Sequence, residues 1–191
     1  MDTGRLEAFT DGVIAIIITI MVLEMKPPQG ASLAALSAST PMFLAYALSY
    51  VNVGIFWNNH HHMLHATERV DGKVLWANLF LLFWISLMPF AIRWMDDAHF
   101  TALPTAAYGV TLAMASIGYI LLEWAIVACN GASSALARAV GNDLKSELSL
   151  LAYAVSIALA FVRPWIAITL YVVVALMWLV PDQRIESVLK E

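Results

Sequence analysis

Six long apolar stretches, separated by short polar turns, restrict most strongly what this chain can fold into. The stretches are rich in Ala, Leu and Met and lack the alternation of polar and apolar residues that marks the strands of a membrane barrel. The hydrophobic fraction is 61% and only 13% of residues are charged, too few to cover the surface of a water-soluble domain. A bilayer core of about 30 Å takes roughly 20 helical residues to cross. The sequence therefore predicts an all-α integral membrane protein.

We expect six transmembrane helices in one domain of residues 1–191. Pro27 and Pro28 end the first helix, and Pro181 ends the last. The last two helices are nearly continuous, so Arg163 and Pro164 must form a tight hairpin. The second helix begins at Leu33 or Thr40. The expected ranges are about 6–25, 40–65, 74–94, 102–128, 147–162 and 164–180.

The positions of the basic residues predict the orientation in the membrane. With the N-terminus inside, the outer turns hold three of them: Lys26, Arg93 and Arg163. Because inner loops are enriched in Lys and Arg, we expect both termini in the cytoplasm of a multi-pass protein. The seven on the inner side are Arg5, Arg69, Lys73, Arg138, Lys145, Arg184 and Lys190.

The sequence lacks the signals of several functional classes of protein. A net charge of -4 does not suggest a nucleic-acid partner. Cys129 is the only cysteine, and no phosphate-binding loop, nucleophile elbow or Cys-x-x-Cys is present. We therefore expect neither an enzyme nor a bound cofactor. The Thr-Val-Gly-Tyr-Gly type of potassium filter is absent as well.

The first helix is unusual for a single membrane span. Only twelve uncharged residues lie between Asp11 and Glu24, which span roughly 18 Å. That length favours a helix inside an assembly with hydrated ends. Spaced at 100° per residue, one face is apolar apart from one hydroxyl, and Asp11 points away from it. Such a stripe suits a protein core, lipid or a pore. Its members are Phe9, Gly12, Val13, Ile16, Thr19, Ile20 and Leu23.

A resemblance to a known family favours the pore. Residues 5–16, RLEAFTDGVIAI, resemble the Arg-x-x-x-Phe-Ser-Asp-Gly opening of the bacterial relatives of transmembrane protein 175, the lysosomal potassium channel family. The likeness continues through residues 19–24, the WNNHHH segment at 57–62, Arg69-Val70-Asp71 and residues 78–89. Thr10 stands where the family has Ser; both carry a hydroxyl, but Thr is stiffer at χ1.

The resemblance implies a homotetramer of six-helix subunits in the cell membrane of a prokaryote. In this family the first helix lines the pore, and bulky apolar side chains replace a carbonyl filter. Ile16 matches the constriction and Thr19 the hydroxyl three positions on, with Ile20 and Leu23 continuing the face. The implied function is a potassium-selective or potassium-preferring cation channel whose partners are its own copies, lipid and permeant K⁺. The Glu24 side chains of the subunits either form a ring of carboxylates that attracts cations at the outer mouth, or Glu24 is simply a solvated helix end.

The remaining motif residues are expected to form a supporting polar network. Arg5, Phe9, Thr10 and Asp11 belong to the opening motif, and we assign Arg5 and Asp11 to architecture. A carboxylate facing the helix bundle needs hydrogen-bond donors. The candidate partners of Asp11 are His60, His61, His62, Trp76 and Asn78.

Two other constellations stay open as alternatives. His61 and His65 are four residues apart, a spacing that suits zinc, but no third ligand is evident from the sequence, and we predict no metal. Glu123 is a carboxylate within an apolar stretch. Together with the histidines of the second helix it is the best candidate for the ion-coupling site of a secondary transporter. No internal repeat of the kind that transporters often carry is evident.

Overall fold

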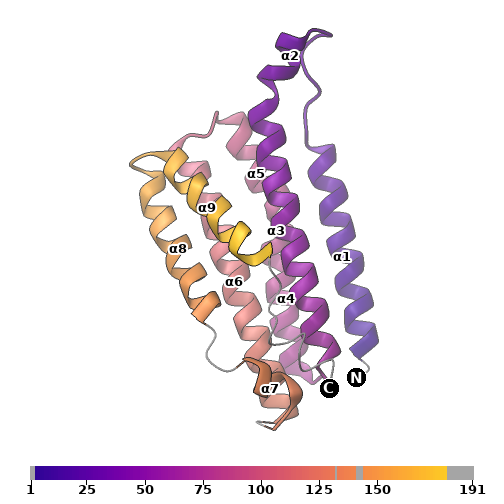
Figure 1. The fold of residues 1–191 in the computed structure, drawn as a ribbon. Coiled ribbons are helices and arrows are strands. Elements are labelled where there is room, and N and C mark those ends of the chain that lie inside the picture. Colours follow the sequence, from indigo (N-terminus) through magenta and orange to yellow (C-terminus); the bar gives the residue numbers. More distant parts are fainter. Residues whose placement is uncertain (1–2, 132, 141–143, 180–191) are drawn as a thin grey trace.

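The structure, a computed structural model, describes residues 3–131, 133–140 and 144–179. Every regular element in these ranges is a helix, which confirms the all-α prediction (Figure 1). The elements are α1 (Thr3–Leu23), α2 (Leu33–Ala38), α3 (Thr40–His65), α4 (Gly72–Ser86), α5 (Met88–Asp97), α6 (Ala102–Asn130), α7 (Ala135–Val140), α8 (Leu144–Ala160) and α9 (Pro164–Leu179). Val180, Pro181, Arg184 and Lys190, which entered the sequence argument, lie outside the described residues.

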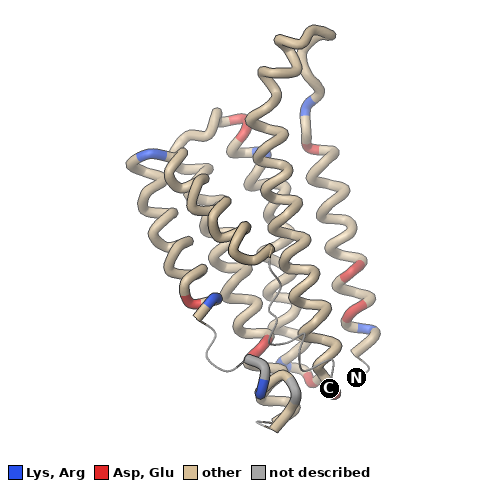
Figure 2. Tube along the Cα trace, in the orientation of Figure 1, with Lys and Arg blue, Asp and Glu red and all other residues tan. Residues whose placement is uncertain are grey.

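Among the described residues, three helical segments are long and apolar enough to cross a membrane: α1, the α4–α5 segment Gly72–Asp97, and α6. α9 is apolar but has only 16 residues, about 24 Å of helix. α3 has 26 residues but contains the polar run Asn58–His62 near its C-terminal end. Charged residues lie mostly toward the two ends of the bundle, and the middle is largely free of them (Figure 2). The structure is thus that of a membrane protein, while six crossings stay a prediction.

The helix expected at 74–94 is two helices, interrupted at Leu87. Pro89 has no N–H, and in an unbroken helix its ring would clash with the carbonyl group four residues earlier, that of Ile85. Proline is tolerated in the first turn of a helix, and Pro89 lies there in α5. The Ser86 hydroxyl donates to the carbonyl oxygen of Phe83 at 2.7 Å, which satisfies an acceptor near the end of α4.

α6 lies at the centre of the bundle and packs mainly against α4 and α8. The approach of α4 is close because position 118 is glycine. A Cβ atom added to Gly118 would lie 2.8 Å from the Leu81 Cα atom, a distance that real Cβ atoms do not adopt. Small residues at such crossings let helix backbones approach closely. α8 and α9 then pack against each other after a three-residue turn.

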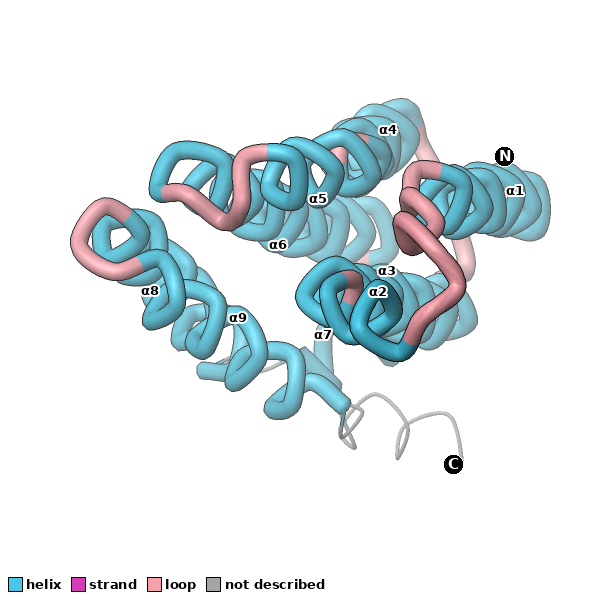
Figure 3. The backbone as a smooth tube through the Cα atoms, turned by 90° about the horizontal axis from the view of Figure 1, so that it is seen from above, coloured by secondary structure: helices cyan, strands magenta, loops and turns pink. Residues whose placement is uncertain are grey.

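α1 lies at one edge of the subunit, on the side opposite α8 (Figures 1 and 3). It packs against α3, α4 and α5 only through one face. The buried residues of that face are Leu6, Thr10, Ile14, Ile17 and Met21. The rest of α1 is therefore free to contact another molecule.

Candidate functional site: the outer face of the first helix and its polar supports

The predicted pore stripe lies on the exposed side of α1. Ile16 is 59% exposed and Leu23 is 80% exposed, whereas the adjacent Ile17 is 3% exposed. Phe9 and Ile20 are exposed too, and Val13 is half-buried. The subunit's own core therefore does not take up this face. Exposed apolar side chains in a row along one helix need a partner, either lipid or other subunits.

Thr19 is exposed in the same row as Ile16. Its hydroxyl donates a hydrogen bond to the Ile16 carbonyl oxygen at 2.8 Å. The hydroxyl hydrogen is used within the helix, so the lone pairs of the Thr19 oxygen are left to accept from water or to contact a cation.

Three of the predicted motif residues form a buried chain of hydrogen bonds across three helices. The Asn78 side-chain amide of α4 donates to the Thr10 hydroxyl oxygen of α1 at 3.0 Å. His60 Nε2 of α3 lies 2.8 Å from Asn78 Oδ1. All three side chains are almost fully buried. Threonine in place of the family's serine thus supplies the acceptor that this network needs.

The structure corrects the expected partner of Asp11. The residue is exposed, and its carboxylate accepts a hydrogen bond from the indole Nε1 of Trp57 on α3 at 2.8 Å. Trp57 was not among the predicted donors. Of those, Trp76 is 75% exposed on α4. Arg5 is exposed at the start of α1.

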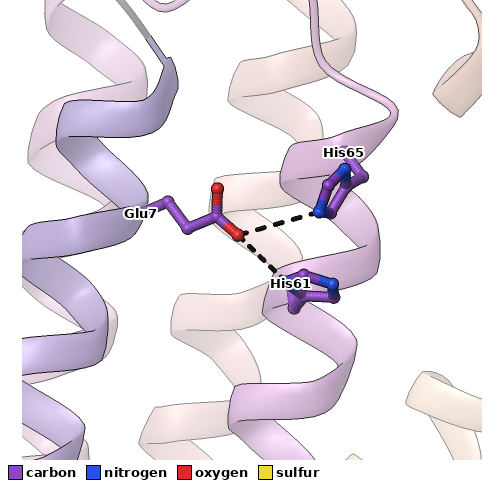
Figure 4. A group of neighbouring side chains, drawn as sticks. All are labelled: Glu7, His61 and His65. Carbon is purple, nitrogen blue, oxygen red and sulfur yellow. Dashed lines mark hydrogen bonds and ion pairs between the residues drawn. The ribbon is translucent and has the colours of Figure 1, made fainter.

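Glu7 of α1, which was not among the predicted site residues, contacts two histidines of α3. Its Oε1 atom is 2.9 Å from His61 Nδ1 and 3.8 Å from His65 Nε2 (Figure 4). The His61 ring stacks on Trp57 and meets the His62 ring edge-on. The sequence signal for this cluster was a pair of histidines one helical turn apart and a glutamate in the opening motif. The glutamate is 54 residues from His61 in the chain, and only the packing of α1 on α3 brings them together.

Glu24, at the other end of α1, is paired with a cation. Arg93 Nη1 of α5 lies 3.2 Å from the Glu24 carboxylate and also donates to the Glu24 carbonyl oxygen. Arg93 Nε donates to Asp97 at 2.9 Å, and Lys26 approaches the same carboxylate at 2.6 Å. Glu24 is therefore ion-paired within its own subunit, while its side chain stays 44% exposed. Two cations and two anions cancel in this group.

The residues of the transporter alternative lie on different helices. Glu123 is buried on α6. His60 and His61 make their side-chain contacts with Asn78 and Glu7, on α4 and α1. The histidines are thus engaged with the first-helix motif.

Comparison with known proteins identifies relatives of the chain. The family model of the endosomal/lysosomal potassium channel TMEM175 matches residues 5–89. A potassium channel of a Chryseobacterium species is 52% identical over the full length of both chains. A potassium channel of Chamaesiphon minutus is 30% identical over 92% of each chain. Among solved structures, the crystal structure of a lysosomal potassium-selective channel TMEM175 homolog from Chamaesiphon minutus aligns with a TM-score of 0.81 and 25% identity, over 94% of this chain and 97% of that one.

Proposed function

Because the chain belongs to the TMEM175 potassium channel family, we propose that it is a potassium channel whose pore is built from the exposed face of α1. The family and these relatives are ion channels and not enzymes. The observation that carries the proposal is the contrast along α1, where Ile16 is exposed and Ile17 is buried. A face that the subunit leaves open is available to line a conduit shared with other subunits.

Several copies with their Ile16 side chains around one axis form a narrow apolar constriction. Such a ring expels water when closed, which is gating by dewetting. An ion passing it loses part of its hydration, and K⁺ holds its water less tightly than Na⁺. The Thr19 oxygen, with its hydrogen already donated to the Ile16 carbonyl oxygen, is placed to offset some of that loss. Ile20 and Leu23 continue the apolar wall.

The proposed assembly is a homotetramer with six membrane crossings per subunit. It places both termini in the cytoplasm of a prokaryotic cell, with Glu7 at the inner end of α1 and Glu24 at the outer end. The edge position of α1 supports this arrangement, because only an edge helix can reach an axis outside its own subunit.

Flux into liposomes tests the proposal. Purified protein reconstituted in vesicles with a K⁺ gradient is expected to show rapid K⁺ uptake, with slower uptake of Na⁺, and unitary currents in planar bilayers. Vesicles without protein serve as the control. Uptake at carrier-like rates with no unitary currents would instead favour the secondary transporter.

A further inference from the structure

One cluster of side chains has no part in the pore proposed above. It consists of Glu7 on α1 and of His61 and His65 on α3. The carboxylate oxygen and one nitrogen of each imidazole all lie within 4.8 Å of one another. Figure 4 shows the Glu7 carboxylate directed at both rings.

The spacing of the three atoms fits a tetrahedral metal ion. Bonds of about 2.0–2.1 Å to Zn²⁺ place neighbouring ligand atoms about 3.3 Å apart. The distances from Glu7 Oε1, 2.9 Å to His61 and 3.8 Å to His65, lie on either side of that value. Both distances are within about half an ångström of that value, and the two imidazole nitrogens lie within 4.8 Å of each other.

The ligand types select among metals. Two imidazoles and one carboxylate suit Zn²⁺, Co²⁺ and Ni²⁺, whereas Mg²⁺ and Ca²⁺ prefer all-oxygen sites. The same two rings and one carboxylate give K⁺ little to bind, so the cluster is distinct in its chemistry from a permeation site.

The cluster is also held in place and open to solvent. His61 and His65 are one turn apart on α3, and the His61 ring stacks on Trp57 with 6.0 Å between ring centroids. The flanking residue Leu6 is buried and fixes the rotation of α1. The three ligand side chains are between 28% and 53% exposed, so an ion and a fourth ligand from water can reach them.

We propose that Glu7, His61 and His65 bind one divalent transition-metal ion per subunit, Zn²⁺ or an ion of similar chemistry. The ion displaces the hydrogen shared by Glu7 and His61, which leaves to the solvent as a proton, and it joins α1 to α3 through three bonds. The proposal does not depend on ion conduction, and its consequence is a subunit that is stabilised by the metal.

Cobalt spectroscopy on the full-length protein in detergent tests this site. Co²⁺ is expected to give visible absorption bands of a tetrahedral site at one ion per subunit, and Zn²⁺ to displace it. The same Co²⁺ additions are expected to raise the melting temperature. Glu7→Gln and His65→Gln should each weaken binding at least about tenfold. His62→Gln, a neighbouring histidine outside the cluster, should bind as the parent protein does.

Three results would overturn the proposal. One is the absence of saturable Co²⁺ bands in the parent protein, measured on material that melts cooperatively. A second is binding that survives both Glu7→Gln and His65→Gln. The third is loss of binding in His62→Gln. A failure of K⁺ flux in liposomes leaves these readouts unchanged, so the tests of the metal site and of the channel are separable.

Discussion

The Asn78 amide of α4 donates a hydrogen bond to the Thr10 hydroxyl oxygen of α1 at 3.0 Å, and both side chains are fully buried. His60 of α3 meets the other end of the same amide. These contacts fix how α1 is rotated against its neighbours. That rotation decides which face of α1 is left outside the subunit, so a buried network sets the direction of the proposed pore face.

Removal of the Thr10 hydroxyl should destabilise the subunit. Thr10→Val keeps the shape but leaves the buried Asn78 amide without its acceptor, at a cost of about 1–3 kcal/mol. The melting temperature of the purified protein should fall. Thr10→Ser should retain most of the stability, and Thr19→Val, on the exposed face, should change it little. Equal melting temperatures for Thr10→Val and the parent protein would contradict this role.

A methyl group at position 118 should force α4 away from α6. The Cβ atom of Gly118→Ala would lie 2.8 Å from the Leu81 Cα atom, and backbone cannot yield as a flexible side chain does. We expect a loss of about 1–3 kcal/mol, measured by thermal or denaturant unfolding. Gly54→Ala is the matched control, since nothing lies within 4 Å of its added Cβ and alanine favours the helix. If Gly118→Ala proves as stable as Gly54→Ala, the close packing is not required.

Arg93 should restrain the electrostatic effect of Glu24. Arg93→Gln leaves the Glu24 carboxylate without its cation, so negative potential at that end of α1 rises and attracts K⁺. Flux in liposomes should increase at about 0.01 M ionic strength and return to the parent value at about 1 M. Glu24→Gln removes an anion from the same neutral group, so flux at low ionic strength should fall below the parent value. Equal flux in the two variants would show that this group does not act on the permeating ion.

Two adjacent isoleucines should respond differently to the same substitution. Ile16→Asn places an amide on the exposed face, so the subunit should keep its stability while the K⁺ over Na⁺ permeability ratio falls or the pore stays open. Ile17→Asn buries an amide without a partner and should lower the melting temperature instead. Permeability ratios in planar bilayers and melting curves separate the two outcomes. An unchanged ratio in Ile16→Asn would remove Ile16 from the constriction.

The sequence was sufficient where local rules decide the outcome. The 100° spacing along α1 separates Ile16 from Ile17, and the structure places one outside and the other inside the subunit. A proline cannot continue the interior of a helix, and the chain breaks at Leu87, two residues before Pro89. Both follow from the geometry of a single helix.

Contacts between helices could not be derived in the same way. Trp57 lies 46 residues from Asp11 in the chain, and Arg93 lies 69 residues from Glu24. Each pair depends on how two helices are rotated and shifted against each other, which the packing of residues such as Gly118 determines. For the same reason the spacing of His61 and His65 does not reveal Glu7 as the third residue of their cluster.

The central claim is that identical subunits bring their Ile16 side chains together around one axis. Oxidative cross-linking of Ile16→Cys in a Cys129→Ser background tests it most directly, because a disulfide forms only where Cα atoms lie within about 7 Å. Ala15→Cys, exposed at the same depth but rotated by about 100°, is the matched control. A pore shared along the Ile16 face predicts covalent dimers of subunits for Ile16→Cys and none for Ala15→Cys. Monomers alone for Ile16→Cys, with dimers for Ala15→Cys, would contradict it.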